Sequence, residues 1–311
     1  MPPQRIEMPR RTTRDPSRLR EIDRDVNDAI ARHSAAGFRF EAGGTRSFAR
    51  QEGTGADVVL LHGVPTSSFL YRKMLPVLAD QGLRATAFDF PGLGLADRPA
   101  PFDYSWSGLA NWTGEAVDAL GLDRVHLVVH DLGGPIGFEW AIRNPDRVLS
   151  LTVLNTLVDV ASFKRPWPMA PFAKRGIGEL WLRLSPRFIF SEIFYSQGIA
   201  QRSRVPRSAI YAHIALLRLH DRGRAFLEIM RGFELTAEKE RFFHDGLAAR
   251  QYPARIVWGE RDPALGLAKL ADVKRALGVD DEIRLPAKHF LQEDHPVEIA
   301  QAIADLAAPL G

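Results

Sequence analysis

The segment LVVHDLGGPIGF places a carboxylate at a position where chemistry is usually carried out by another residue type. Its apolar, β-branched run leads to Asp131, and Gly133 and Gly134 follow at once, as a sharp turn requires. This strand–turn–helix pattern is typical of a nucleophile elbow, in which a serine normally stands at the apex. An aspartate there needs no base to activate it, because a carboxyl group with a reference pKa of about 3.9 is already ionised at pH 7. The pattern therefore predicts a carboxylate nucleophile.

An acid and a histidine follow Asp131 in the order that is found downstream of nucleophile elbows. Asp262 comes just after the apolar segment ARIVWG, and His289 comes just after the segment DEIRLPA. Loops at the carboxyl ends of parallel strands meet at one edge of a sheet, so we expect the three side chains to converge. Capping aspartates and a surface histidine are the structural alternative. Three residue types in this order, each after its own strand, favour a triad.

This triad predicts displacement at carbon in two steps. Asp131 displaces a leaving group from an sp³ carbon and forms an alkyl ester. His289, oriented by Asp262, then activates a water that attacks the carbonyl carbon of the ester. The backbone N–H groups of Val64, in the segment LHGVP, and of Leu132 are expected to form the oxyanion hole for this second step. Such a nucleophile points to carbon–halogen bonds or epoxide carbon–oxygen bonds, and away from carboxylic esters and amides.

The elements that must position these residues alternate between strand and helix, which predicts a mostly parallel sheet covered by helices on both faces. A hairpin around Gly43 and Gly44 is expected to start the sheet. The expected strands are 38–42, 45–51, 56–63, 84–90, 124–130, 149–156, 254–262 and 281–287, and the expected helices are 69–82, 106–121, 135–145, 266–278 and 296–310.

The alternation is interrupted in residues 157–235. This segment carries clusters of proline, tryptophan and phenylalanine and helical pieces such as SAIYAHIALLRL, with no convincing buried strand. We interpret it as a helical cap inserted into the core. The predicted organisation is a basic N-terminal extension (1–35), the first part of the core (36–156), the cap (157–235) and the second part of the core (236–311).

Composition restricts the classes of protein and of site. The 311 residues are 45% hydrophobic and 25% charged, as is typical of a globular protein. The sequence contains no cysteine, which excludes disulfides, a thiol nucleophile and thiolate metal sites. No run of about 18 apolar residues is present, so we expect no membrane-spanning helix and a cytoplasmic protein.

The positive charge is concentrated at the N-terminus. The formal net charge is +3, from 41 basic and 38 acidic residues. Residues 1–24 contain seven arginines and four carboxylates, which is +3 already and leaves 34 of each sign in the rest. The basic pI is therefore weak evidence for nucleic-acid binding, and we expect a solvated or loosely packed arm. The expected partners are a small apolar organic substrate and water, with no metal, cofactor, nucleic acid or membrane.

Five segments resemble the haloalkane dehalogenase branch of the α/β-hydrolases: LHGVPTSSFLYRKMLP, FDFPGLGLADRP, VVHDLGGPIGF, WGERDPALG and KHFLQED. The resemblance covers about residues 36–311. The elbow and HGVPTSSFLYRKM are its specific parts, and the rest is shared with epoxide hydrolases. The resemblance implies an α/β-hydrolase fold with a helical cap, Asp131 as nucleophile, His289 as base and Asp262 as its partner.

The position of the acid varies within the family. Some members carry it after the preceding core strand, where this sequence reads Leu154-Asn155-Thr156. No carboxylate is available there, so Asp262 is preferred.

This sequence departs from the family at two positions where relatives carry hydrogen-bond donors for the leaving group. The family usually has a tryptophan directly after the nucleophile and often has asparagine or glutamate after the His-Gly pair. Leu132 and Val64 occupy these places, and neither side chain carries a hydrogen-bond donor. One subgroup of the family keeps a halide-binding tryptophan at about the place of Trp181, fifty residues after the nucleophile. The resemblance therefore makes Trp181 the candidate for the missing halide donor. Ordinary packing of Trp181 within the cap is the favoured alternative.

Three other functions remain open at this point. An epoxide hydrolase uses the same triad, with cap tyrosines that protonate the alkoxide, and Tyr195 and Tyr211 are the candidates. Both tyrosines lie in apolar runs, so packing is again the favoured reading. A cofactor-free oxygenase, like a marine luciferase that resembles this family, or a catalytically silent binding protein would use the same fold. An intact triad argues against the silent protein, since binding does not need one.

Overall fold

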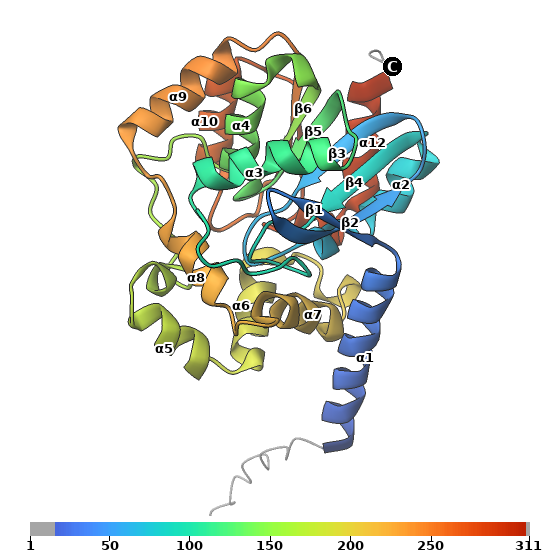
Figure 1. Ribbon diagram of the computed structural model, residues 1–311, viewed down its shortest axis with the longest axis vertical. Coiled ribbons are helices and arrows are strands. Elements are labelled where there is room, and N and C mark those ends of the chain that lie inside the picture. The colour runs from blue at the N-terminus through green and yellow to red at the C-terminus, as the bar shows by residue number, and fades with distance from the viewer. Residues whose placement is uncertain (1–15, 309–311) are drawn as a thin grey trace, which may run out of the picture.

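The protein is described by a computed structural model that covers residues 16–308, and its centre is one eight-stranded sheet (Figure 1). The strand order is β1-β2-β4-β3-β5-β6-β7-β8. The hairpin β1–β2 is antiparallel, β2 pairs antiparallel with β4, and the other pairs are parallel. The strands are β1 (Phe38–Ala42), β2 (Thr45–Glu52), β3 (Ala56–Leu61), β4 (Leu83–Phe88), β5 (Val125–Val129), β6 (Val148–Leu154), β7 (Ala254–Gly259) and β8 (Glu282–Leu285). The predicted fold class is confirmed.

Helices cover both faces of the sheet because the parallel strands are apolar on both sides. In β3, Val58 and Leu60 face one layer, whereas Val59 and Leu61 face the other. The first layer contains α2 (Met74–Asp80) and α12 (Pro296–Ala307), and the second contains α3 (Trp106–Ala119), α4 (Gly133–Arg143), α9 (Ala237–Ala248) and α10 (Leu267–Leu277).

Most expected elements are present, with two differences. The expected helix 69–82 is divided into a 3₁₀ turn (Ser68–Tyr71) and α2, so Pro76 stands in the first turn of α2. A proline there removes no intrahelical hydrogen bond. Helix α9 was not expected, since its segment has only two fully buried side chains, Phe243 and Leu247.

The segment between β6 and α9 is helical. Residues 157–235, all of them described, contain no strand. Figure 1 shows their helices gathered below one end of the sheet. They are α5 (Ile177–Leu184), α6 (Arg187–Gly198), α7 (Arg207–Arg218) and α8 (Arg224–Arg231). The helical content agrees with the expected cap, and we keep 157–235 as its proposed extent.

The expectation of a solvated or loosely packed arm is wrong for the part of the N-terminal segment from Ile22 onward. Residues Pro16–Ala35 form helix α1, which lies beside α7 (Figure 1). Val26 is buried against cap and core residues, and His33 Nε2 lies 3.1 Å from Ser68 Oγ. Asp23 forms an ion pair with Arg187 of the cap. Residues 1–15 lie outside the described part of the chain.

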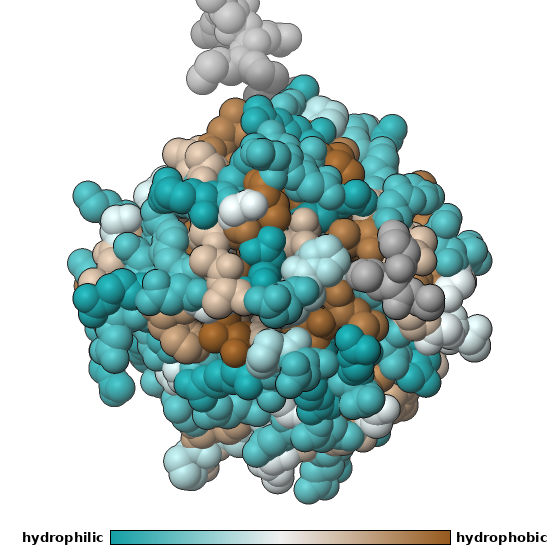
Figure 2. All heavy atoms as spheres, turned by 90° about the horizontal axis from the view of Figure 1, so that it is seen from above, coloured by the Kyte–Doolittle hydropathy of each residue, from teal (hydrophilic) through white to brown (hydrophobic). Residues whose placement is uncertain are grey.

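The surface at the end of the core opposite these cap helices is mostly hydrophilic, with apolar side chains in scattered groups (Figure 2). None of the helices within residues 16–308 is both long enough and apolar enough to cross a bilayer.

Candidate active site

The elbow is a strained turn between β5 and α4. Asp131 has a φ of 52°, in the left-handed region that side chains other than glycine rarely adopt. Its backbone is held on both sides: its N–H donates to the carbonyl of Asn155 (2.9 Å), and its carbonyl accepts from the Thr156 hydroxyl (2.6 Å). A Cβ at Gly134 would overlap the Thr156 hydroxyl, so this turn requires glycine after the nucleophile. The strain is maintained by two neighbours in the loop directly after β6.

The two predicted oxyanion-hole amides both point at the Asp131 carboxylate. The Val64 N–H donates to Asp131 Oδ1 over 2.7 Å, and the Leu132 N–H also bonds to the carboxyl group. A side chain at Gly63 would overlap Asp131 Oδ1, so glycine is needed for this approach. His62 holds the same loop: its Nδ1 lies 2.9 Å from the Gly63 carbonyl, and its Nε2 lies 3.2 Å from the Phe90 N.

His289 stands between the two carboxylates. Its Nε2 lies 3.2 Å from Asp131 Oδ2, and its Nδ1 lies 2.7 Å from Asp262 Oδ2. The other oxygen of Asp262 accepts the backbone N–H groups of Ala264 (2.8 Å) and Leu265 (2.9 Å). The three side chains expected from the sequence are therefore brought together in one chain of contacts, Asp131–His289–Asp262.

Asn155, the residue found where some relatives carry the acid, supports Asp262 directly. Its side-chain nitrogen donates to Asp262 Oδ2 (2.9 Å) and to the Gly259 carbonyl, and its oxygen accepts the Gly259 N–H (2.7 Å). In the sequence, Asn155 is only a place where a carboxylate is missing. The signal for its contact with Asp262 is its position directly after β6, facing the end of β7.

The electrostatics of the site follow from these contacts. Burial by itself lowers the pKa of His289, but the negative charges of Asp262 and Asp131 and the hydrogen bonds to both raise it to about 10. Burial by itself raises the pKa of each carboxyl, yet the contacts with His289 and with backbone N–H groups lower both below their ordinary value. The resting site therefore holds a protonated imidazole between two carboxylates at neutral pH.

A second histidine contacts the triad and was missed by sequence analysis. His130, directly before the nucleophile, places its Nε2 2.9 Å from the His289 carbonyl, and the two rings are 4.8 Å apart. Burial lowers the pKa of His130 to about 3, so it stays neutral and donates its N–H to that carbonyl. This bond fixes the loop that carries His289.

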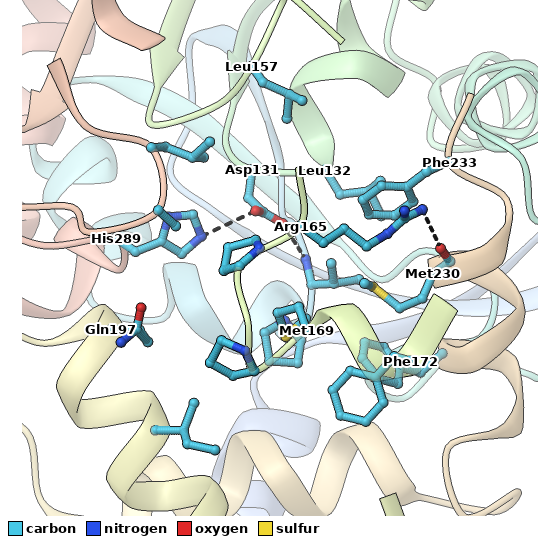
Figure 3. A pocket seen from close by; sticks show the side chains of 18 of the residues that line it. Asp131, Leu132, Leu157, Arg165, Met169, Phe172, Gln197, Met230, Phe233 and His289 are labelled. Carbon is cyan, nitrogen blue, oxygen red and sulfur yellow. Dashed lines mark hydrogen bonds and ion pairs between the residues drawn. The ribbon is translucent and has the colours of Figure 1, made fainter. Parts of the chain in front are cut away.

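The triad opens into a cavity of about 120 Å³ between the core and the cap (Figure 3). That is many times the 10–15 Å³ or so that one water molecule needs, so a small organic molecule fits. Its polar groups come from Asp131, His289, Trp106, Arg165 and Gln197. The remaining walls are apolar and are made by Val64, Pro65, Leu132, Pro135, Leu157, Phe163, Pro166, Pro168, Met169, Phe172, Phe190, Ile193, Phe194, Leu217, Phe226, Met230, Phe233, Ala264, Leu265 and Phe290.

The three expected leaving-group residues do not line this cavity. The Tyr195 hydroxyl donates to the Val205 carbonyl (2.8 Å), and Tyr211 is buried beneath Arg187. Trp181 is partly buried and packs against the main apolar cluster of the protein. The expectation is therefore corrected, and the packing alternative is right for all three.

Sequence analysis missed the polar groups that do line the cavity. Trp106 begins α3 in the core, Arg165 lies in the loop before α5, and Gln197 lies near the end of α6. No sequence pattern distinguished them, because each reaches the cavity only through the packing of the cap on the core. Within residues 16–308, no group of three or more histidine or carboxylate side chains is arranged to hold a metal ion.

Comparison with known proteins agrees with this geometry. Residues 58–296 match the family model described as alpha/beta hydrolase fold. The chain belongs to the α/β-hydrolase fold family. It is 33% identical to haloalkane dehalogenase 2 of Mycobacterium tuberculosis over 267 residues, which cover 82% of this chain and 88% of that protein. It is 32% identical to the haloalkane dehalogenase of Mycolicibacterium paratuberculosis, over 80% of this chain and 82% of the relative.

Solved structures share the fold. A haloalkane dehalogenase from Bradyrhizobium elkani superimposes with a TM-score of 0.73 and 23% identity, over 88% of this chain and 99% of that one. An epoxide hydrolase superimposes with a TM-score of 0.72 and 22% identity over the same shares. With this family and these relatives, the protein is an enzyme of the hydrolase class.

Proposed function

We propose that this hydrolase cleaves the carbon–halogen bond of a small, largely apolar substrate through an alkyl ester on Asp131. The observation that carries the proposal is the Asp131 carboxylate itself. It is ionised, it is bonded through Oδ1 to the Val64 N–H, and it lines a mostly apolar cavity. An ionised carboxylate in such surroundings is a nucleophile for an sp³ carbon.

In the first step Asp131 Oδ2 attacks the carbon that bears the halogen. The carbon–oxygen bond forms as the carbon–halogen bond breaks, and the halide departs with the bonding electron pair. Oδ1 stays on the Val64 N–H and becomes the carbonyl oxygen of the ester. The apolar walls keep bulk water away from the reacting carbon, so water does not compete with Asp131 as the nucleophile.

Formation of the ester prepares His289 for the second step. The pKa of His289 is raised partly by the charge of Asp131 and the hydrogen bond to it, and the ester removes both. Its pKa must then fall, so the imidazole can lose its proton and accept one from water. The water gives its proton to His289 and attacks the ester carbonyl, and the amides of Val64 and Leu132 stabilise the oxyanion. The alkoxide leaves with the Oδ2 oxygen and takes the proton from His289 to become the alcohol. One such donor contributes about 3–4 kcal/mol in other enzymes.

Trp106 is the proposed donor for the departing halide. Its indole Nε1 is buried without a hydrogen-bond partner among the described residues, and Trp106 lines the cavity. Trp181 has the same unpartnered buried indole nitrogen but lies outside the cavity. It is therefore a matched control for Trp106.

The tryptophan pair gives a direct test of the halide donor. Trp106→Phe should lower the rate of chloride release at least tenfold and that of bromide release less, because the poorer leaving group depends more on a donor. Trp181→Phe should leave both rates within twofold of wild type. Equal effects of the two substitutions would reject Trp106 as the donor.

An epoxide is the second candidate substrate, favoured by the raised pKa of His289. A protonated imidazole beside Asp131 can give its proton to the alkoxide and then serve as the base. Against this candidate, no tyrosine is among the cavity residues, and Tyr195 and Tyr211 bond or pack elsewhere.

A paired panel of bromoalkanes and terminal epoxides, with bromide and diol both measured, decides between the two. Bromide release without diol formation supports the dehalogenase. Diol formation without bromide release replaces it with the epoxide hydrolase. Oxygen uptake with a consumed substrate would indicate the oxygenase instead, and no turnover of any substrate would favour a binding protein.

A single turnover in ¹⁸O-water tests the covalent step for either substrate. The product should carry unlabelled oxygen, and a peptide containing Asp131 should carry the label. Label in the product after one turnover would make Asp131 a general base for direct attack by water. A small organic molecule and water are the proposed partners, and the cytoplasmic location stays a prediction that cell fractionation checks.

A further inference from the structure

Arg165 is a charged side chain in the wall of an otherwise mostly apolar cavity. Its Nη2 donates to the Met230 carbonyl over 2.9 Å, and its guanidinium lies 4.7 Å from the centre of the Phe233 ring. Its Nε is buried and has no hydrogen-bond partner among residues 16–308. No described carboxylate lies within ion-pair distance, and burial lowers the pKa of Arg165 with no charged neighbour to offset it. A partly buried guanidinium without a counter-ion is costly to maintain.

Half-buried arginines of this protein donate either to carboxylates or, as Arg98, Arg218 and Arg250 do, to backbone carbonyls, and none of these three lines the cavity. Arg72 forms a two-point contact with buried Glu293, and Arg231 pairs with Glu179 and Glu228. Arg165 differs from both because its described acceptor is a neutral carbonyl. Its guanidinium therefore retains donors for a group that enters the cavity.

The position of Arg165 relates this charge to the reacting carbon. Figure 3 shows the guanidinium beside Met230 and Phe233, while His289 and Gln197 lie on the other side of Asp131. Apolar residues form the walls between these groups. A bound molecule therefore meets a nucleophile at one place and a planar cation at another, with apolar surface between them.

We propose that Arg165 binds a carboxylate, or a similarly small anionic group, on the part of the substrate away from the carbon that Asp131 attacks. A guanidinium matches a carboxylate with two parallel N–H bonds. The substrate class is then a short-chain halogenated acid whose halogen and carboxylate stand at opposite ends. The halogenated acid is a substrate only if Asp131 attacks carbon as proposed above. The binding of an anion by Arg165 does not depend on that reaction.

A purely structural role is the competing explanation. The Met230 carbonyl is near the C-terminal end of α8, where carbonyl groups lack intrahelical partners, so Arg165 also caps that helix. Arg218 does the same for α5. It donates to the carbonyls of Leu182 and Ser185, and its guanidinium lies 5.0 Å from the Phe190 ring. Arg218 does not line the cavity, which makes it the matched control.

The kinetic test compares 6-bromohexanoate with the neutral 6-bromohexanamide. Arg165→Met should lower kcat/KM for the acid at least tenfold, mainly through KM, and change that for the amide less than twofold. Arg165→Lys should keep part of the preference, and Arg218→Met should keep all of it. An equal loss on both substrates, or equal kcat/KM for acid and amide in the wild type, would overturn the proposal.

A binding measurement makes the result independent of turnover. Hexanoate should bind to the wild type at least tenfold more tightly than hexanamide in isothermal titration calorimetry, and Arg165→Met should abolish the difference. Unchanged hexanoate affinity in a folded Arg165→Met variant would refute the anion site. Loss of hexanoate binding without bromide release from any substrate would refute the proposed reaction while the anion site stands. Thermal unfolding of each variant shows whether a loss of hexanoate binding is due only to misfolding. Arg165→Lys is the milder change to compare if Arg165→Met does not fold.

Discussion

The two walls of the cavity are held in place by different interactions. On the core wall, Asp131 is bonded through its backbone to Asn155 and Thr156 and through its carboxylate to Val64, and Asp262 fixes the ring of His289. The bonded groups lie in loops at the ends of neighbouring strands, which bring them close together. The hydrogen bonds between them are short and directional. A displacement of any member breaks a hydrogen bond at buried atoms, which costs about 1–3 kcal/mol.

On the cap wall, positions are set mainly by the packing of apolar side chains. The Phe172 ring lies 5.0 Å from the Phe226 ring, and the Phe194 ring lies 4.3 Å from that of Phe290, which joins cap to core. Packing of this kind tolerates exchanges of similar volume, often at less than about 1.5 kcal/mol. We therefore propose that the core wall determines which reaction occurs and that the cap wall determines which molecule is admitted.

The largest effect is expected for the base on the core wall. His289→Phe keeps an aromatic ring but cannot activate water, so turnover should stop after the first step. Intact-mass spectrometry with a productive bromoalkane should show one alkyl adduct per chain, and proteolytic digestion should locate it on Asp131. Full turnover by this variant, or an adduct on another residue, would contradict the assigned roles.

A smaller but still large effect is expected at the oxyanion hole. In Gly63→Ala the new Cβ overlaps Asp131 Oδ1, so the Val64 N–H can no longer reach the carboxylate as it does now. Loss of one such donor lowers kcat about 10²–10³-fold in other enzymes. Steady-state halide release measures the effect. Gly114→Ala is the control, because a Cβ there meets Trp140 at an ordinary 3.5 Å.

A modest effect is expected on the cap wall. Ile193→Ala removes apolar volume from the cavity side of α6 without touching the triad. We expect KM to rise about three- to tenfold for a short bromoalkane and less for a longer one that fills the added space, with kcat nearly unchanged. A comparison of kcat and KM along a chain-length series checks this. A drop in kcat comparable to that of the core-wall variants would break the division of roles.

The smallest effect is expected on stability as the pH rises. The pKa of His289 is about 10 in the folded protein and about 6.5 when unfolded, so its contribution to stability is fully present below pH 6.5 and is lost progressively as the pH approaches 10. The melting temperature of the wild type should therefore fall over this range by a few degrees more than that of His289→Phe. Parallel curves for the two proteins would show that His289 is not held protonated in the fold.

The sequence was sufficient to predict the core and the meeting of Asp131, Asp262 and His289, because both follow short-range rules. Alternation of apolar runs with amphipathic segments predicts a parallel sheet, and residues directly after buried strands must lie at its edge. Asp131, Asp262 and His289 each stand at such a place, so their order along the chain was enough to expect their meeting. The amides of Val64 and Leu132 were predictable for the same reason.

Tertiary packing alone decided the cap side of the cavity. Trp181, Tyr195 and Tyr211 have the right chemistry, but each turns toward neighbours inside the cap or at its junction with α1. Arg165 and Trp106 carry no local pattern and reach the cavity because a loop of the cap is laid over α3 and the elbow. The helical periodicity of a sequence predicts which side of a helix is apolar. How that helix crosses a neighbouring layer depends on the volumes of side chains that are far apart in the sequence. The residues proposed to carry the chemistry could therefore be identified from the local sequence, whereas the shape and charge of the cavity came only from the fold.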